Sequence, residues 1–161
     1  MSFWVWFTTL LLHQRYPELD SLEGTIAYYN LKTNEPAYVY YVVLAEGATQ
    51  PSAAQIILGT DASDADAIIS DSVIVELADE LTSMDIEGLE EETNYEIFFA
   101  IKDAADNIQS SVNQSSITTP DTSAPEFADG YPVISTTGST DITLDVSLTE
   151  AGTVYYVVLA N

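Results

Sequence analysis

The stretch YVYYVVLAE at residues 38–46 decides the fold, because it returns as TVYYVVLAN at residues 153–161. Both copies consist mainly of Tyr, Val and Leu, and aromatic and β-branched residues favour strands over helices. A short, continuous apolar run of this kind is typical of a strand that is buried on both faces. The sequence therefore predicts one buried strand and a second copy of it.

The repeat is wider than this one strand. Tyr40–Ala45 matches Tyr155–Ala160 in all six residues, at a spacing of 115 positions. Upstream, the pair Tyr16-Pro17 recurs as Tyr131-Pro132 at the same spacing. A period of this length corresponds to a whole domain rather than to one turn of a solenoid.

The repeat divides the chain into three expected parts. Residues 1–15 are an apolar N-terminal segment that shares nothing with the repeat, and residues 16–120 are a complete domain. Residues 121–161 are a linker with the first three strands of a second copy. The second copy covers only about a third of the domain length, since a domain needs about 100 residues.

Short runs of strand-favouring residues, bounded by turn residues, predict an antiparallel β-sandwich for the complete copy. One short helix is predicted over Pro51–Gly59, because Pro stands at its start and Gly at its end. The expected strands lie near 16–19 and at 24–32, 38–45, 72–78, 84–89, 94–102 and 109–118.

The chain is strongly acidic. It contains 26 Asp and Glu residues against three Lys and Arg, which gives a formal net charge of −23. Such a polyanion repels nucleic acid, which proteins bind chiefly through Lys and Arg, and it is equally poorly suited to anionic membranes. The absence of cysteine excludes disulfides, thiolate metal sites and thiol catalysis. We therefore expect neither a nucleic-acid nor a membrane partner.

The inventory of side chains argues against an enzyme. His13 is the single histidine, and it stands in the N-terminal segment, so a Ser-His-Asp relay has no suitable base. Acidic pairs are so abundant that none of them stands out as a catalytic pair.

Calcium is the one cofactor that the sequence suggests, because carboxylate oxygens suit this hard cation. The loop at 61–66 lacks the Gly and the terminal Glu of an EF-hand. The alternative is that these Asp and Asn residues only supply turn chemistry, and the sequence leaves both open. The candidate ligands form two sets, Asp61, Asp64 and Asp66 in one loop, and Asp103, Asp106, Asn107 and Asp121 further along.

Three short motifs resemble segments of known β-sandwich modules. Residues 88–95 (GLEEETNY) resemble the region in which a Tyr, here Tyr95, forms a tyrosine corner with backbone a few residues upstream. Residues 100–107 (AIKDAADN) resemble the turn A-x-D-x-x-G-N, with Asp106 where glycine is common. Residues 118–125 (TTPDTSAP) resemble the linkers between tandem modules.

The resemblance covers residues 16–161 and implies a fibronectin-III-like or Ig-like β-sandwich with a short helical insert, followed by a partial second copy. The helix and its YYVVLA lead-in are similar to a variant in repeats of bacterial surface and S-layer-associated proteins. This implies a structural module at a prokaryotic cell surface or outside the cell. Because such modules serve many functions, an adhesin or carbohydrate-binding repeat, using Tyr-rich faces or the loop at 61–71, is the alternative.

The second copy as it stands leaves apolar side chains in water. Its strands are expected at 131–134, 141–148 and 152–159, with Ile26 matching Ile142 after a slip of one residue. Three strands alone expose one inner face, and each large apolar side chain there forfeits roughly 1.5–3 kcal/mol. Either the sequence is a piece of a longer array, or a neighbour completes the second copy.

The N-terminal run MSFWVWFTTLLL is the candidate donor for such completion. It is too short to span a bilayer, which takes about 20 residues, and it lacks the basic leading region and the cleavage site of a signal peptide. A run this apolar packs into its own domain, into a partner or into a membrane, and we favour packing, either within the domain or as a strand added to a neighbour. Repeated head-to-tail addition builds a filament from copies of the chain. The residues assigned to assembly are Phe3, Trp4, Val5, Trp6, Phe7, Leu10, Tyr155, Val157 and Leu159.

Overall fold

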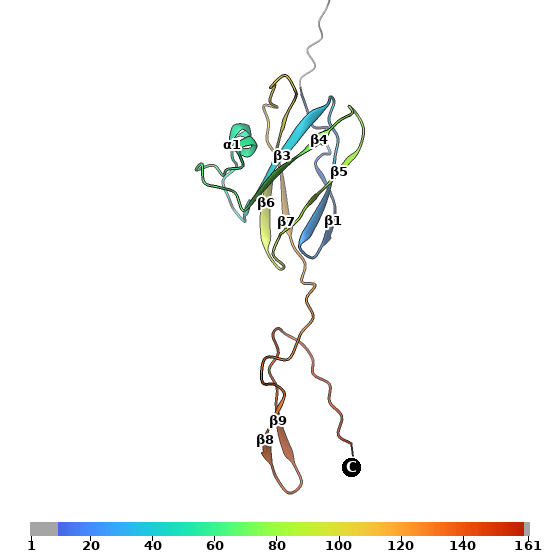
Figure 1. Ribbon diagram of the computed structural model, residues 1–161, viewed down its shortest axis with the longest axis vertical. Helices are drawn as coiled ribbons and strands as arrows, with labels where there is room; N and C mark the ends of the chain where they lie inside the picture. Colours follow the sequence, from blue (N-terminus) through green and yellow to red (C-terminus); the bar gives the residue numbers. More distant parts are fainter. Residues whose placement is uncertain (1–9, 160–161) are drawn as a thin grey trace, which may run out of the picture. The chain divides into compact units, whose positions relative to one another are not determined.

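The computed structural model describes residues 10–159, which form two compact units divided after Asp121. Figure 1 shows the ribbon of both units. Nearly all of the regular structure is antiparallel β-strand, which confirms the all-β fold class. The division lies one residue beyond the boundary expected at residue 120.

The first unit contains two antiparallel sheets. One has three strands in the order β1-β2-β5, and the other has four strands in the order β4-β3-β6-β7. Consecutive strands β2 and β3 therefore lie in different sheets, so the chain crosses between the sheets after β2. The bounds are β1 Glu18–Glu23, β2 Ile26–Leu31, β3 Ala37–Ala45, β4 Ile69–Val75, β5 Thr82–Ile86, β6 Asn94–Lys102 and β7 Asn113–Thr118.

Both sheets pack against one shared core. Every second side chain of a strand points to the same face, which brings Tyr29 and Leu31 of β2 against Val39 and Phe99 of the other sheet. The rings of Tyr29 and Phe99 meet edge to face, with centroids 5.3 Å apart. The Tyr29 hydroxyl donates a hydrogen bond to Ser115 Oγ (2.8 Å), and burial raises the pKa of Tyr29 to about 12.

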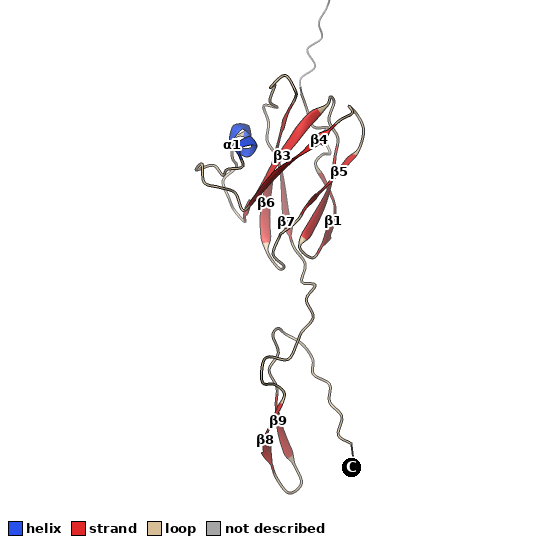
Figure 2. Cartoon of the chain, viewed as in Figure 1, coloured by secondary structure: helices blue, strands red, loops and turns tan. Residues whose placement is uncertain are grey.

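Strand β3 is buried on both faces, as its continuous apolar sequence predicts. Val42 and Leu44 point away from the shared core and pack in a second cluster with Ile56 of the helix α1 (Ala53–Leu58). This helix, coloured blue in Figure 2, covers the outer face of the four-stranded sheet. Ser52 is its N-cap residue and forms a capping box with Gln55.

Helix α1 ends where the sequence predicts. Gly59 adopts the left-handed conformation (φ 77°), and its N–H bonds to the carbonyls of Gln55 and Ile56. A side chain at this position would meet Ser70, because an added Cβ would lie 2.7 Å from Ser70 Oγ. Glycine is therefore required here both by the backbone and by the neighbouring strand β4.

Most expected strands lie within a few residues of their predicted bounds, and β6 has them unchanged. Strand β4 instead begins at Ile69 rather than at the expected residue 72. The reason is its register against β3, which pairs Ile69 with Val43 and Val75 with Ala37. Leu77, which lies within the expected bounds but outside β4, is exposed.

The chain enters and leaves the first unit at opposite ends. Leu12 is buried, and its N–H donates to Gln109 Oε1 (3.4 Å) shortly before β7 begins. Directly after β7, the N–H of Thr119 donates to the Thr93 carbonyl (3.0 Å). The full length of β7 therefore separates the two points.

The described part of the N-terminal run packs against its own unit. Leu10 and Leu12 belong to the shared core, and Leu10 is only 4% exposed. Leu10, which the sequence assigned to assembly, is therefore a core residue of its own unit in this structure. Phe3–Phe7 lie outside the described residues, so their role as a donor stays a prediction.

The second unit contains the antiparallel pair β8 (Val133–Thr137) and β9 (Ile142–Asp145). The third strand expected at 152–159 does not form. The first unit supplies the reason, because the matching strand β3 pairs with β4 and β6 and not with β2. Counterparts of β4 and β6 are absent from residues 122–159, so this segment has no strand beside it.

Candidate docking surface

The pair β8–β9 repeats the pair β1–β2 at a constant spacing. Leu19 lies opposite Tyr29, and Ile134 lies opposite Leu144, each number being 115 higher in the second pair. The register shifts directly after Leu19 in one pair and directly after Ile134 in the other. The same bulge at the same place means that the two pairs share one backbone geometry.

This register corrects the expected alignment of the two copies. Ile142 takes the place of Ala27, not of Ile26, so there is no slip of one residue. The repeated geometry also starts earlier than residue 16, because the bridge between Leu12 and Thr33 returns 115 residues later. Its counterpart joins Phe127 to Leu148, and backbone hydrogen bonds beside the bridge are repeated as well. Backbone bonding is shared here although the side chains differ.

The constant spacing identifies a core-facing set of side chains in the second unit. Positions that fill the core of the first unit carry apolar residues again, but here they are exposed to solvent. We call this exposed set the acceptor face. Matched to their buried counterparts, its members are Phe127 (Leu12), Ile142 (Ala27), Leu144 (Tyr29), Val146 (Leu31), Tyr156 (Tyr41) and Val158 (Val43).

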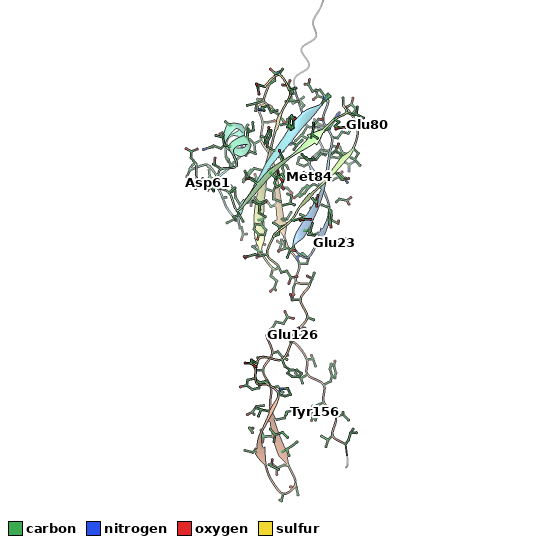
Figure 3. The ribbon with its side chains drawn as sticks, in the orientation of Figure 1. Glu23, Asp61, Glu80, Met84, Glu126 and Tyr156 are labelled. Carbon is green, nitrogen blue, oxygen red and sulfur yellow. The ribbon has the colours of Figure 1, made fainter. Side chains whose placement is uncertain are left out.

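The C-terminal segment shows the contrast most clearly. Tyr156 and Val158 are 79% and 73% exposed, whereas Tyr41 and Val43 are 6% and 0% exposed. Figure 3 labels Tyr156, which projects from a segment with no strand at its side. An open groove of about 640 Å³ separates this segment from β8 and β9, and it is lined by Ile134, Ile142, Thr143, Leu144, Tyr156, Val157 and Val158.

The structure also places the C-terminal residues that the sequence assigned to assembly. Tyr155, Val157 and Leu159 are exposed, and they match Tyr40, Val42 and Leu44 on the face that α1 covers in the first unit. The sequence analysis missed Tyr156 and Val158 on the opposite face. Strand alternation along residues 38–45 is the signal that separates the two faces, but only the observed pairing shows which one meets the shared core.

The loop at 61–66 uses its carboxylates internally. Asp61 Oδ1 accepts hydrogen bonds from the Ser63 hydroxyl and N–H (both 2.7 Å) and from the Ala65 N–H (3.0 Å). The Ser63 hydroxyl bond, followed by the two backbone bonds, holds the pKa of Asp61 below its usual value. Gln55 Nε2 donates to Asp64 Oδ1 (2.7 Å), which ties the loop to the helix.

The turn after β6 is built in a similar way. Asp103 Oδ1 accepts from the N–H groups of Ala105 and Asn107 (both 2.8 Å), and Oδ2 accepts from Asn107 Nδ2 (2.7 Å). The Asn107 side chain is the first cause of the lowered pKa of Asp103. Asp106 adopts the left-handed conformation (φ 64°) at the place where glycine is common, and pairs with Lys102 (3.1 Å).

The two candidate calcium sets differ in how they come together. Asp103, Asp106 and Asn107 share one turn, while Asp121 follows β7 at its opposite end. Within residues 10–159, no group of three or more His, Asp or Glu side chains is arranged to hold a metal ion. The observed bonds of Asp61 and Asp103 are turn chemistry, and calcium binding stays a prediction.

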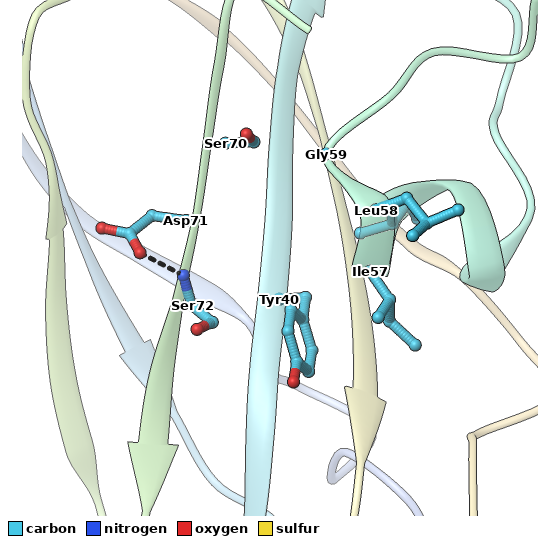
Figure 4. Close-up of a pocket in the computed structure, with 8 residues that line it drawn as sticks. Tyr40, Ile57, Leu58, Gly59, Ser70, Asp71 and Ser72 are labelled. Atoms are coloured by element: carbon cyan, nitrogen blue, oxygen red, sulfur yellow. Dashed lines mark hydrogen bonds between the residues drawn. The ribbon is translucent and has the colours of Figure 1, made fainter. Parts of the chain in front are cut away.

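A second surface lies on the outer face of the four-stranded sheet. A cavity of about 190 Å³ opens beside α1, between Tyr40 of β3, the helix end at 56–59 and residues 70–72 of β4 (Figure 4). The Tyr38 ring lies beside the Tyr40 ring, with the two centroids 6.3 Å apart. Lys102 Nζ lies 6.0 Å from the centroid of Tyr40.

The turn before β6 has the bond that the resemblance implies for Tyr95. The Glu90 N–H donates to the Tyr95 hydroxyl (3.0 Å), five residues upstream.

Comparison of the whole chain with models of protein families, and with curated proteins, finds no match. Among the described residues, no helix is long and apolar enough to cross a membrane.

Proposed function

We propose that the protein is a structural module of a prokaryotic extracellular surface protein or filament. In this proposal residues 16–120 are a fibronectin-III-like sandwich, and residues 121–161 are a linker with the first part of a second copy. A neighbouring unit completes this copy by adding strands, so that units join head to tail. The proposal gives the protein no catalytic role.

The acceptor face is the observation that carries this proposal. Its side chains stand at the sequence positions whose counterparts fill the core of the first unit, and Ile142 and Leu144 also repeat the strand register there, yet these side chains are exposed to water. Burying one large apolar side chain stabilises a protein by roughly 1.5–3 kcal/mol. A face with six such residues therefore favours association with whatever supplies the missing half of the core.

The topology of the first unit supports a head-to-tail arrangement. Leu12 and Thr119 lie at opposite ends of the unit, so a preceding neighbour and a following neighbour attach at different places. A contact between two different surfaces extends into an open chain of units when the rotation between neighbours does not close a ring. The donor predicted from sequence, Phe3–Phe7 of another copy, fits this scheme because it precedes Leu10.

Sedimentation velocity and negative-stain electron microscopy of the full chain test the proposal. We expect assemblies that grow with protein concentration and appear as filaments. Running both measurements with calcium and with chelator tests the calcium prediction separately, because loss of filaments in chelator alone would place the ion at the joint. Monomers at every concentration in both buffers would overturn the assembly proposal.

Two adjacent tyrosines provide a matched pair of variants. Tyr156 matches the core residue Tyr41, whereas Tyr155 matches Tyr40 on the outer face. Both are exposed in the described structure, so Tyr156→Asp and Tyr155→Asp add the same charge at equally accessible places. We expect Tyr156→Asp to abolish assembly and Tyr155→Asp to weaken it much less. Equal loss in both variants would mean that general charge repulsion, and not the acceptor face, controls assembly.

An adhesin or carbohydrate-binding repeat is the second candidate. The observation that favours it is the pair Tyr38 and Tyr40 on the outer face, where Tyr38 is 42% exposed and Tyr40 lines the open cavity beside α1. Aromatic rings of this kind stack on the apolar faces of sugars. Glycan-array binding that is lost in Tyr38→Ala, with assembly unchanged, would favour this candidate over a purely structural role.

A further inference from the structure

We propose that residues 1–9 of the N-terminal run dock on an apolar patch of their own first unit whenever a neighbour does not receive them. The docking itself depends on the first unit alone, and only the exchange with a neighbour rests on the proposed function. Residues 1–9 lie outside the described part of the chain. The surface around the point where they join the unit is described, and it is unusually apolar.

Exposed apolar side chains of the first unit gather at the end where the chain enters. The loop between β4 and β5 and the turn between β6 and β7 both lie at this end (Figure 1). Apolar side chains that lie together on a surface mark interaction sites, whereas single ones are common everywhere. We call this group the entry patch. Its members, each between 42% and 58% exposed, are Leu11, Tyr38, Ile74, Leu77, Leu81 and Ile108.

One half of the entry patch lies in the loop that contacts the described start of the chain. Leu77 and Leu81 stand on either side of Asp79, whose Oδ1 lies 2.7 Å from His13 Nε2. The N–H of Asp79 also donates to the Thr33 carbonyl (2.8 Å), beside the bridge that Thr33 forms with the N-terminal run. This loop is therefore fixed next to the residues that directly follow residues 1–9.

The other half of the entry patch lies on the four-stranded sheet. Tyr38 lies opposite Ile74 on one side and opposite Lys102 on the other, and Lys102 forms a bridge with Ile108. A hollow of about 130 Å³ opens here, lined by Pro36, Ala37, Tyr38, Ile74, Val75 and Ala104. Every one of these residues is apolar or aromatic, so the hollow suits an apolar side chain and offers no charged partner.

Composition and attachment identify residues 1–9 as the occupant. The stretch Phe3–Phe7 (FWVWF) consists entirely of large apolar residues, and residues 1–9 (MSFWVWFTT) contain no charged side chain. They are followed directly by Leu10, which is 4% exposed in the shared core, so they leave the core at the entry patch. Nine extended residues span at most about 30 Å, which is enough to cross the end of one domain.

Charge argues against a second copy of the chain as the occupant. Three exposed acidic residues, Glu76, Asp79 and Glu80, border the entry patch, and a second copy would bring its own formal charge of −23. Residues 1–9 bring no charge, so their docking meets no such repulsion. The same side chains cannot fill the entry patch and a neighbour's acceptor face at once, and docking therefore competes with assembly.

The two tryptophans of the chain report on this docking alone. Trp4 and Trp6 are the only ones in the sequence, and both belong to the proposed occupant. Acrylamide quenching and the emission maximum are measured on dilute full chain that sediments as a monomer. The test variant is Leu77→Asn/Leu81→Asn. The matched control is Leu58→Asn/Ile68→Asn, which removes two comparably exposed apolar side chains at the helix end and just before β4.

We expect the tryptophans of the original monomer to be shielded from acrylamide. The test variant should weaken docking at least about tenfold, because it removes two apolar contacts. Its quenching should then approach that of the chain unfolded in urea, with emission at longer wavelength, while the control stays like the original. Freely quenched tryptophans in the original monomer would overturn the inference. So would shielding that the test variant leaves unchanged, because the run would then pack elsewhere. A dimer that the test variant dissociates, with tryptophans quenched throughout, would assign the entry patch to a second copy instead.

The exchange with a neighbour has a separate readout. Weaker docking raises the fraction of chains whose run is free to be donated, so the test variant should assemble at a lower protein concentration than the original chain. A higher threshold would overturn the exchange, because the entry patch would then belong to the contact between neighbours. If no chain assembles at any concentration, the proposed function fails, and the tryptophan measurement still decides the docking.

Discussion

Replacing Val43 by alanine, and Val158 by alanine in a separate chain, removes the same side chain from the same hexapeptide in two environments. Val43 is 0% exposed between the two sheets, and Val158 is 73% exposed. Loss of two methyl groups costs about 0.8 kcal/mol each in transfer free energy, and the remaining cavity adds to this. We expect Val43→Ala to lower the free energy of unfolding of the first unit by about 2–3 kcal/mol.

The exposed position should behave differently. Val158→Ala is expected to change the same free energy by less than about 0.5 kcal/mol, as surface substitutions do. Urea titration followed by far-UV circular dichroism measures both, at concentrations where the original chain is monomeric. For a urea m-value of about 1–3 kcal/mol/M, Val43→Ala should move the midpoint by about 1 M or more.

The two results together show whether the contribution of the hexapeptide to stability depends on its sequence alone or on the strands packed around it. If Val158→Ala destabilises the first unit as much as Val43→Ala does, the C-terminal segment is buried in solution and our description of the acceptor face is wrong. If Val43→Ala is neutral, the core assignment of β3 fails instead.

Three further predictions follow from single positions. Gly59→Ala should lower the melting temperature of the first unit, because the left-handed backbone and the contact with Ser70 cost about 1–3 kcal/mol together. Asp103→Asn should remove part of the acid sensitivity of stability. Because the pKa of Asp103 is lowered in the folded state, its carboxylate stabilises the fold above the usual Asp pKa near 3.9. This stabilisation is lost as pH falls through the folded-state pKa. The difference in free energy of unfolding between the original chain and the variant should therefore become smaller in acid. Tyr41→Phe should flatten the alkaline limb of a stability profile, since burial raises the pKa of Tyr41 to about 12 and the stabilisation is lost between about pH 10, the usual Tyr value, and pH 12.

Local patterns predicted most elements of the first unit. The run at 94–102 gave the bounds of β6 without error, and Pro51 with Gly59 framed the helix that begins at Ala53. These signals are local, because turn residues and apolar runs lie next to the elements that they delimit. The sequence misplaced β4, whose bounds depend on its pairing with β3 and not on its own composition.

The candidate site depended on contacts that a sequence pattern does not contain. Residues 152–159 read as a strand because they repeat β3, yet a strand exists only beside partners, and the partners of β3 are β4 and β6. Likewise, similarity between Ile26 and Ile142 suggested a slip that the backbone register does not have. Pairing between distant segments carries this information, and neither composition nor local identity reports it.

The opposite placement of Leu12 and Thr119 has a mechanical consequence. Tension applied through the two ends of the first unit would pull β1 and β7 along their own axes, toward opposite ends of the unit. Antiparallel hydrogen bonds run perpendicular to the strands, so this load shears the bonds of a whole strand at once instead of opening them one after another. Such a unit resists tension along its length more than it resists the peeling of its strands from one end.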